Sequence, residues 1–293
     1  MKFLHLGSSM CGMDITRRSF VALSATLPFA LRADAATSSV PIGLELYSVR
    51  EALKQDPEGT VRAVAQLGYQ CVEFYGPYYA WTHDQAKSMR KLMDDLGIRC
   101  HSTHNDQSNF SKDKITHARD LNLILGTKYM VMASSNPKPG LDGWKAIADE
   151  LNNAADILEP DGLKPGYHNH QPEFKRMDHD GARPIEILAK NTKPTVMLQL
   201  DVGTCLDSGG DPAAWIRSNP GRVRSAHLKD WSSESRKGYQ VLFGEGDAKW
   251  KEIFAAAESN GVEYYLLEQE GSRFGELETA KRCLQAYKSM RGA

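Results

Sequence analysis

Two histidines and a glutamate lie close together in residues 164–174, KPGYHNHQPEF, and side chains of these types bind metals or move protons. Side chains in an extended strand alternate between its two faces, so His168 and His170 point to the same side. Pro172 cannot donate a ladder hydrogen bond, which predicts that the strand ends near it. Glu173 would then join the two imidazoles at the strand end, and the segment predicts a metal and sugar site.

Further polar residues interrupt apolar runs that are typical of strands. These residues are His104, Asp201, His227, Lys229 and Glu268. An ionised carboxylate that is buried costs several kcal/mol unless it is paired or bound to a cation. Carboxylates and histidines that converge on one place therefore predict one divalent metal ion, held by oxygen and imidazole ligands.

Such convergence requires elements that bring the strand ends to one edge. Strand-like segments are expected at residues 42–47, 70–75, 98–104, 128–133, 164–174, 196–201, 223–229 and 263–268. Helical patterns separate them at residues 57–67, 84–96, 112–125, 140–158, 184–189, 212–217, 250–260 and 276–290. The first helix has clear boundary signals, because Asp56 can cap its start, Pro57 suits its first position and Gly68 suits its end.

The alternation of strands and helices predicts a parallel sheet, and eight such units in about 250 residues predict a closed (β/α)8 TIM barrel in a single domain. An open, doubly wound sheet is the alternative. That fold usually has a glycine-rich turn after its first strand, and residues 47–50, YSVR, contain no glycine. Active sites of TIM barrels lie at the C-terminal ends of the strands, where the polar residues are expected.

The first 35 residues resemble an export signal rather than part of the fold. Arg17 and Arg18 form a twin-arginine pair, an apolar run follows at 21–31, and Ala-Asp-Ala at 33–35 is a small-x-small cleavage site. We therefore expect a cleaved twin-arginine signal at 1–35, a short linker at 36–40, and the barrel at 41–293 of a periplasmic protein. A membrane anchor is the alternative, but the run is shorter than the roughly 20 residues a spanning helix needs.

Composition narrows the partners of the protein. The formal net charge of −1 offers no electrostatic footprint for nucleic acid. We expect a small-molecule sugar or keto-glycoside as partner, and no membrane partner once the signal is cleaved. Aromatic residues near the expected mouth, which include Tyr47 and Tyr75, would serve as a platform for a sugar ring or as the face of a homo-oligomer. The cysteines outside the leader form no C-x-x-C pair, which favours buried free thiols over disulfides.

From about residue 42 onward, the sequence resembles the sugar phosphate isomerase/epimerase family of xylose isomerase-like TIM barrels. The stretches that carry the resemblance are GLELYSVR at 43–50, GYHNHQPEF at 166–174, LQLDVG at 198–203, AHLKD at 226–230, GEGDAKW at 244–250 and YYLLEQ at 264–269. The resemblance implies one divalent metal, Mn, Mg, Co or Zn, bound by a Glu, Asp, His, Glu set from strands 5 to 8. Asp201, His227 and Glu268 match the last three positions of that set.

Strand 5 departs from the family pattern. Many members have a glutamate there in a context like Glu-Asn-His, where this chain has His168, Asn169 and His170. The fourth ligand is therefore either Glu173, displaced by a few residues, or His168. We prefer Glu173, because a carboxylate keeps the charge of the site near that of the family and leaves His168 and His170 for the substrate.

The resemblance implies a sugar isomerase or epimerase that removes the proton next to a carbonyl through a metal-stabilised enediolate. Glu173 and Glu268 would act as bases on opposite faces of the substrate. Lys229 would neutralise a developing oxyanion and contact the substrate. His104, His168 and Tyr47 would bind it, and His170 would bind a hydroxyl or shuttle a proton.

Three other functions are compatible with these residues. The same first step followed by loss of a β-oxygen gives a dehydratase or a 3-keto-glycoside lyase or hydrolase. A non-catalytic, exported sugar-binding protein is a further alternative. Endonuclease chemistry is disfavoured because the chain has no basic surface and no extra histidine after Asp201. We assign Glu45, Glu73 and Glu270 to structural or rim roles.

Overall fold

The computed structural model describes residues 40–177 and 181–292. The predicted export signal at 1–35 and nearly all of the predicted linker at 36–40 lie outside the described residues, so both stay predictions. Over the ranges that the structure describes, no helix combines the length and apolar character that membrane crossing requires.

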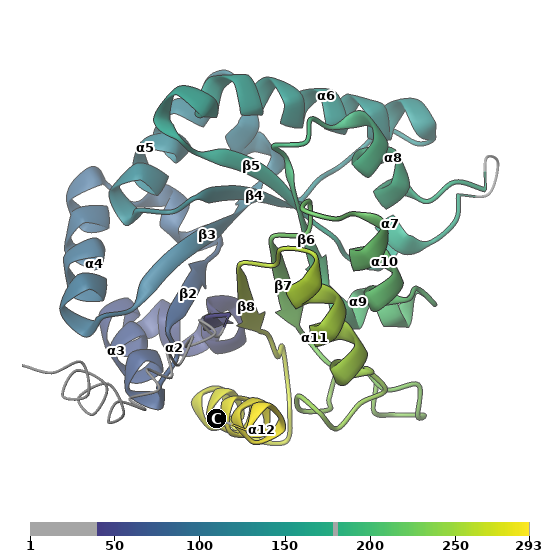
Figure 1. Cartoon of the computed structure of the whole chain (residues 1–293). Coiled ribbons are helices and arrows are strands. Elements are labelled where there is room, and N and C mark those ends of the chain that lie inside the picture. The colour runs from purple at the N-terminus through teal and green to yellow at the C-terminus, as the bar shows by residue number, and fades with distance from the viewer. Residues whose placement is uncertain (1–39, 178–180, 293) are drawn as a thin grey trace, which may run out of the picture. The chain divides into compact units, whose positions relative to one another are not determined.

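Eight parallel strands close into a barrel in the order of the chain, and the last strand pairs with the first. The strands are β1 (Ile42–Glu45), β2 (Cys71–Phe74), β3 (Arg99–Asp106), β4 (Tyr129–Ser134), β5 (Lys164–His168), β6 (Met197–Asp201), β7 (Ser225–Leu228) and β8 (Tyr264–Leu267). Figure 1 shows helices arranged around the outside of these strands. The predicted (β/α)8 barrel is therefore confirmed.

The helices follow the strands as the alternation predicted, with additional short helices near the strand ends. They are α2 (Arg50–Gln55), α3 (Pro57–Leu67), α4 (His83–Leu96), α5 (Ile115–Leu125), α6 (Leu141–Leu158), α7 (Gln171–Phe174), α8 (Pro184–Asn191), α9 (Val202–Asp207), α10 (Pro212–Ser218), α11 (Trp250–Ser259) and α12 (Glu276–Arg291). In α3, the Asp56 carboxylate accepts from the Gly59 backbone N–H at 2.9 Å, and Gly68 ends the helix with a φ of 99°. These boundaries agree with the capping signals in the sequence.

The barrel interior has an apolar layer that supports the polar mouth. This layer is a cluster of buried residues, namely Cys71, Tyr129, Val131, Met197, Tyr264 and Leu266. Gly43 of β1 lies opposite Cys71, and a Cβ atom at Gly43 would be only 2.7 Å from the Cys71 carbonyl oxygen. The interior is therefore too tight at this level for a side chain on Gly43.

The segment after β5 differs from the expected continuous strand. Strand β5 ends at His168, and residues 171–174 form the short helix α7, which has Pro172 in its first turn. Proline favours the first turn of a helix because its missing N–H has no partner there. Because β5 ends early, the Glu173 side chain turns back toward Tyr167 and the His170 backbone.

Candidate active site

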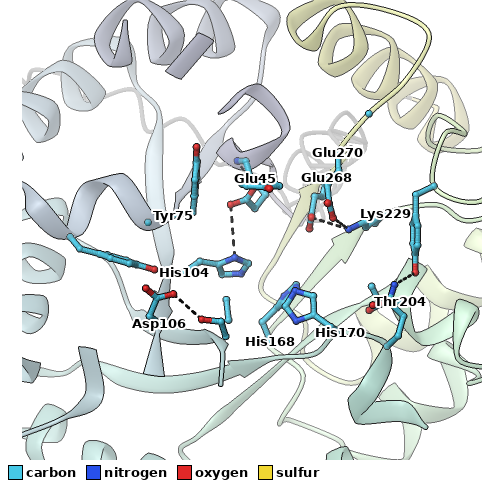
Figure 2. A pocket seen from close by; sticks show the side chains of 18 of the residues that line it. Glu45, Tyr75, His104, Asp106, His168, His170, Thr204, Lys229, Glu268 and Glu270 are labelled. Atoms are coloured by element: carbon cyan, nitrogen blue, oxygen red, sulfur yellow. Dashed lines mark hydrogen bonds and ion pairs between the residues drawn. The ribbon is translucent and has the colours of Figure 1, made fainter. Parts of the chain in front are cut away.

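A cavity of about 670 Å³ opens at the C-terminal ends of the strands. Six of the residues predicted for the site line it, namely Tyr47, His104, His168, His170, Lys229 and Glu268. Figure 2 shows the imidazoles of His104, His168 and His170 close together at the cavity. Lys229 lies across from them, beside Glu268 and Glu270. Residues from separate strands therefore meet at one mouth, as the sequence predicted.

Four side chains form a group that can hold a metal ion. His168 of β5, Asp201 of β6, His227 of β7 and Glu268 directly after β8 each offer a ligand atom, and these atoms lie within 4.8 Å of one another. All four residues are buried. Three of the four predicted ligands are thus brought together, and His168 takes the position that belongs to strand 5.

Glu173 does not join this group. Its Oε1 accepts from the Tyr167 hydroxyl at 2.8 Å, and its Oε2 accepts from the His170 backbone N–H at 2.8 Å. It is also not among the residues that line the cavity. The geometry thus favours His168 over Glu173 as ligand, against our preference from the sequence, because the strand ends at His168 and Glu173 turns back to cap α7.

The chemistry of the four donors fits a divalent cation. The Oδ1 atom of Asp201 accepts from the Thr204 backbone N–H at 2.8 Å, whereas its buried Oδ2 atom has no hydrogen-bond partner in the part of the chain that the structure describes. That oxygen lies 4.0 Å from Nε2 of His168 and 3.8 Å from Nζ of Lys229. A buried carboxylate oxygen without a partner is costly, and two imidazoles with two carboxylates form a ligand set that transition metals favour.

The Lys229 ammonium compensates the negative charge of the carboxylates around the four-residue group. Its Nζ lies 3.1 Å from Oε1 of Glu268 and also contacts the Glu270 carboxylate. Although burial opposes the charged carboxylate, Lys229 and His227 outweigh it and hold the pKa of Glu268 well below its ordinary value. Glu268 is therefore ionised at neutral pH, and Glu270, whose side chain is 44% exposed, occupies the rim as expected.

His227 is held between two carboxylates. Its Nδ1 lies 2.5 Å from Oε2 of Glu268, and its Nε2 lies 2.8 Å from Oε2 of Glu73. Burial opposes the charged imidazole, but the carboxylates of Glu73 and Glu268 outweigh it and raise the pKa of His227 to about 10. By contrast, burial and the neighbouring His227 and His104 hold the pKa of His168 well below its ordinary value, so His168 is neutral.

The sequence underestimated two glutamates that lie in this site. Glu73 is completely buried and contacts both His104 and His227. Glu45 lines the cavity and accepts from the Tyr47 backbone N–H at 2.5 Å. Its buried Oε1 has no hydrogen-bond partner among the described residues and lies 3.9 Å from Nδ1 of His104. Burial, followed by the charges of Glu268 and Glu73, raises the pKa of Glu45 well above its ordinary value. Both glutamates interrupt apolar strand patterns in the sequence, and this feature could have identified them as site residues.

The metal-free protein should lose stability as the pH rises from about 7 to about 10. The pKa of His227 is about 10 in the folded protein against 6.5 for a free imidazole, so folding takes up a proton in this window and becomes less favourable as that proton is lost. The loss should be on the order of a few kcal/mol. Urea unfolding with a chelator present, at pH 7 and pH 9.5, measures it.

The control for this pH dependence is His227→Gln, which removes the titrating group and leaves the other ionisable side chains. The variant should show a shallower loss of stability between the two pH values. Equal slopes for the wild type and the variant would contradict the assignment of the raised pKa to His227.

The fold and site together define a (β/α)8 barrel with a buried His, Asp, His, Glu group at its C-terminal mouth. Residues 61–290 match the family described as xylose isomerase-like TIM barrel, and this chain belongs to that family.

Among curated proteins, the chain is 24% identical to an inosose dehydratase of Clostridium beijerinckii over 139 residues, or 42% of this chain and 46% of that protein. It is 23% identical to the rhizopine catabolism protein MocC of Rhizobium meliloti over 236 residues, or 71% of this chain and 68% of that protein. The match thus spans less than half of the dehydratase, and about two thirds of MocC.

Solved structures share the fold over nearly the whole barrel. A sugar phosphate isomerase/epimerase from Parabacteroides distasonis has a TM-score of 0.73 and 27% identity, and the match covers 89% of this chain and 98% of that one. The IOLI protein, solved with a zinc atom, has a TM-score of 0.65 and 16% identity, with 85% and 97% covered. The similar proteins are thus named for isomerase, epimerase and dehydratase activities, and one of them binds a metal.

Proposed function

We propose that this protein is a divalent-metal-dependent sugar isomerase or epimerase, which removes a proton from the carbon next to a carbonyl. The observation that carries the proposal is the placement of the ionised Glu268 carboxylate at the cavity, beside Lys229 and within the four-residue group. The sugar phosphate isomerase/epimerase that shares 27% identity supports the reaction class.

His168, Asp201, His227 and Glu268 would hold the metal ion. When bound, the ion would supply Lewis acidity that polarises the substrate carbonyl. The paired imidazoles favour manganese, cobalt or zinc over magnesium, because magnesium prefers oxygen ligands and water. The IOLI protein, which shares the fold, was solved with a zinc atom, and this supports metal binding by a protein of this fold.

Glu268 is the base of the proposed reaction. Its pKa lies well below the ordinary value because Lys229 and His227 stabilise the anion, so the carboxylate is ionised at neutral pH, which a general base must be. Lys229 is 3% exposed and keeps its positive charge, since the nearby carboxylates raise its pKa well above the ordinary value despite burial. It can therefore stabilise the negative charge that develops on the substrate oxygen.

The other side of the cavity would bind and orient the sugar. His104, His168 and His170 present imidazoles to the cavity, and the rings of Tyr47 and Tyr75 lie 5.1 Å apart at its rim. Since Glu173 lies outside the cavity, the opposing base for epimerisation would be another residue that lines it, such as His170. A single base suffices for isomerisation, because one carboxylate can carry a proton between adjacent carbons on one face.

Elimination of water or an alcohol is the second candidate reaction. The matches to inosose dehydratases support it, and so does Glu45. The raised pKa of Glu45 favours its protonated form, whereas the lowered pKa of Glu268 favours its ionised form, which suits one as acid and the other as base in the same cavity. A protonated Glu45 can donate to a departing oxygen at the β-carbon. Keto-glycosides would be suitable substrates for this reaction if residues 1–35 export the protein as predicted.

Proton exchange in D₂O tests the proposal. The metal-loaded protein should incorporate deuterium next to the carbonyl of a ketose or inosose that it binds, as measured by NMR. An isomer whose mass differs only by the deuterium supports isomerisation, whereas a product that has lost water or an aglycone supports elimination. A ketone that binds by calorimetry and yet exchanges no proton would indicate a sugar-binding protein and would contradict both reactions.

A further inference from the structure

A buried polar layer lies directly beneath the proposed metal group. Glu73 of β2 and Gln199 of β6 form this supporting layer, and they are 0% and 1% exposed. Between them, the two side chains contact all three imidazoles of His104, His168 and His227. Neither residue belongs to the group of His168, Asp201, His227 and Glu268, although Glu73 also lies close enough to Glu45 and His104 to form a second possible metal-holding group with them.

The Glu73 carboxylate is surrounded by groups that can donate. Its Oε1 accepts from the Gln199 Nε2 at 3.0 Å and from the Ser102 hydroxyl. Its Oε2 lies 2.8 Å from Nε2 of His227 and 3.0 Å from Nε2 of His104. A carboxylate only accepts hydrogen bonds, so the nitrogen of His227 that faces it must carry a proton.

The same reasoning fixes the orientation of Gln199. Because Glu73 offers only acceptors, the Gln199 amide must turn its NH₂ group toward Glu73, and that NH₂ also donates to Ser225 Oγ at 3.2 Å. The Gln199 Oε1 then faces Nδ1 of His168 at 3.0 Å and Nε2 of His104 at 2.7 Å. An amide oxygen only accepts, so His168 donates through its Nδ1.

In each of the two proposed histidine ligands, one ring nitrogen contacts Gln199 or Glu73 and the other does not. Nε2 of His168 points toward Asp201, with 4.0 Å between the nitrogen and Oδ2, and Nδ1 of His227 points toward Glu268. We propose that Glu73 and Gln199 are positioning residues that fix the two tautomers, so that a divalent metal binds His168 through Nε2 and His227 through Nδ1. This inference rests on the proposed metal site.

A purely structural role for Glu73 and Gln199 makes a different prediction. If they only filled the centre of the barrel, their replacement would change stability without changing the tautomers or the affinity for metal. A partner that orients a metal-bound imidazole typically contributes about 10- to 100-fold to metal affinity. Measurements of metal affinity and of the histidine tautomers therefore show whether Glu73 and Gln199 position the imidazoles or only fill the centre of the barrel.

The decisive measurement is long-range ¹H–¹⁵N NMR of the zinc-loaded, histidine-labelled wild-type protein. His168 should show a protonated Nδ1 and zinc at Nε2, whereas His227 should show a protonated Nε2 and zinc at Nδ1. The opposite tautomer at either residue, with zinc bound, would overturn the inference and leave the metal site intact. A protein that binds no zinc would instead overturn the proposed metal site itself.

The matched variants are Glu73→Gln and Ser102→Ala, which both remove interactions of the supporting layer. Glu73→Gln should raise the dissociation constant for Co²⁺ about 10- to 100-fold and change its visible absorption spectrum. Ser102→Ala leaves in place the hydrogen bonds that the imidazoles donate to Glu73. Its Co²⁺ affinity should therefore stay within a few-fold of the wild type. Equal Co²⁺ affinities for Glu73→Gln and the wild type would overturn the inference. If Glu73→Gln does not fold, the wild-type NMR result decides.

Discussion

Replacement of Glu268 by glutamine should lower kcat by roughly 10²- to 10⁴-fold, which is the usual contribution of a positioned acid or base. The change removes the proposed base and one of the four metal donors while it keeps the size of the side chain. Steady-state turnover, or the rate of deuterium exchange into a bound ketone, measures the effect. Wild-type activity in this variant would exclude Glu268 as base and as an essential ligand.

Glu270→Gln is the matched control, because Glu270 contacts the same Lys229 ammonium from the rim of the cavity. Its side chain is 44% exposed, and Lys229 keeps its contact with Glu268 and its ion pair with Asp201 when the Glu270 charge is removed. We therefore expect kcat to change by no more than a few-fold. An equal loss in both variants would assign the effect to the charge balance of Lys229, not to the base.

Replacement of Asp201 by asparagine should weaken metal binding by at least about 100-fold and abolish metal-dependent activity. Oδ2 of Asp201 has no hydrogen-bond partner among residues 40–177 and 181–292, and burial raises the pKa of the carboxyl, which Lys229 only partly offsets. The metal-free protein should therefore lose little stability in this variant, because it no longer buries a charge whose ion pair with Lys229, at 3.8 Å, only partly offsets the cost of burial. Titration with Zn²⁺ against a chromophoric chelator, together with metal-free unfolding curves, measures both effects.

A pair of variants then decides which residue of the strand 5 region is the ligand. His168→Gln should weaken Zn²⁺ binding as Asp201→Asn does, whereas Glu173→Gln should retain it, since Glu173 is occupied by Tyr167 and His170. Loss of binding in Glu173→Gln with retention in His168→Gln would restore the preference drawn from the sequence. Retained binding in Asp201→Asn would contradict the proposed metal site.

The supporting layer gives these predictions a common physical basis. Glu73 is completely buried, and within residues 40–177 and 181–292 it has no lysine or arginine among its hydrogen-bond and ion-pair partners. Its charge is therefore compensated by hydrogen bonds from imidazoles, a hydroxyl and an amide. Such networks are rigid when they are fully satisfied, because each member would lose its partners if it moved. Rigid imidazoles are what a metal site needs, since ligand geometry must be held before the ion arrives.

The sequence by itself predicted the closed barrel and the strand ends that carry Asp201, His227 and Glu268. Both depend on local patterns, because strand and helix periodicity and caps such as Asp56 are set by neighbours in the chain. Once the strands are parallel, their C-terminal ends meet at one mouth. The polar residues there could therefore be identified without knowledge of any contact, and the structure places them together.

Only the tertiary structure decided between His168 and Glu173 and gave Glu73, Gln199 and Glu45 their places. The sequence indicated an end near Pro172, whereas β5 ends at His168, and this small difference turned Glu173 away from the cavity. The contact between Glu73 and His227 joins residues 154 positions apart, and no local pattern encodes it. It forms because closure of the barrel brings β2 and β7 to the same interior, where buried polar groups must satisfy one another.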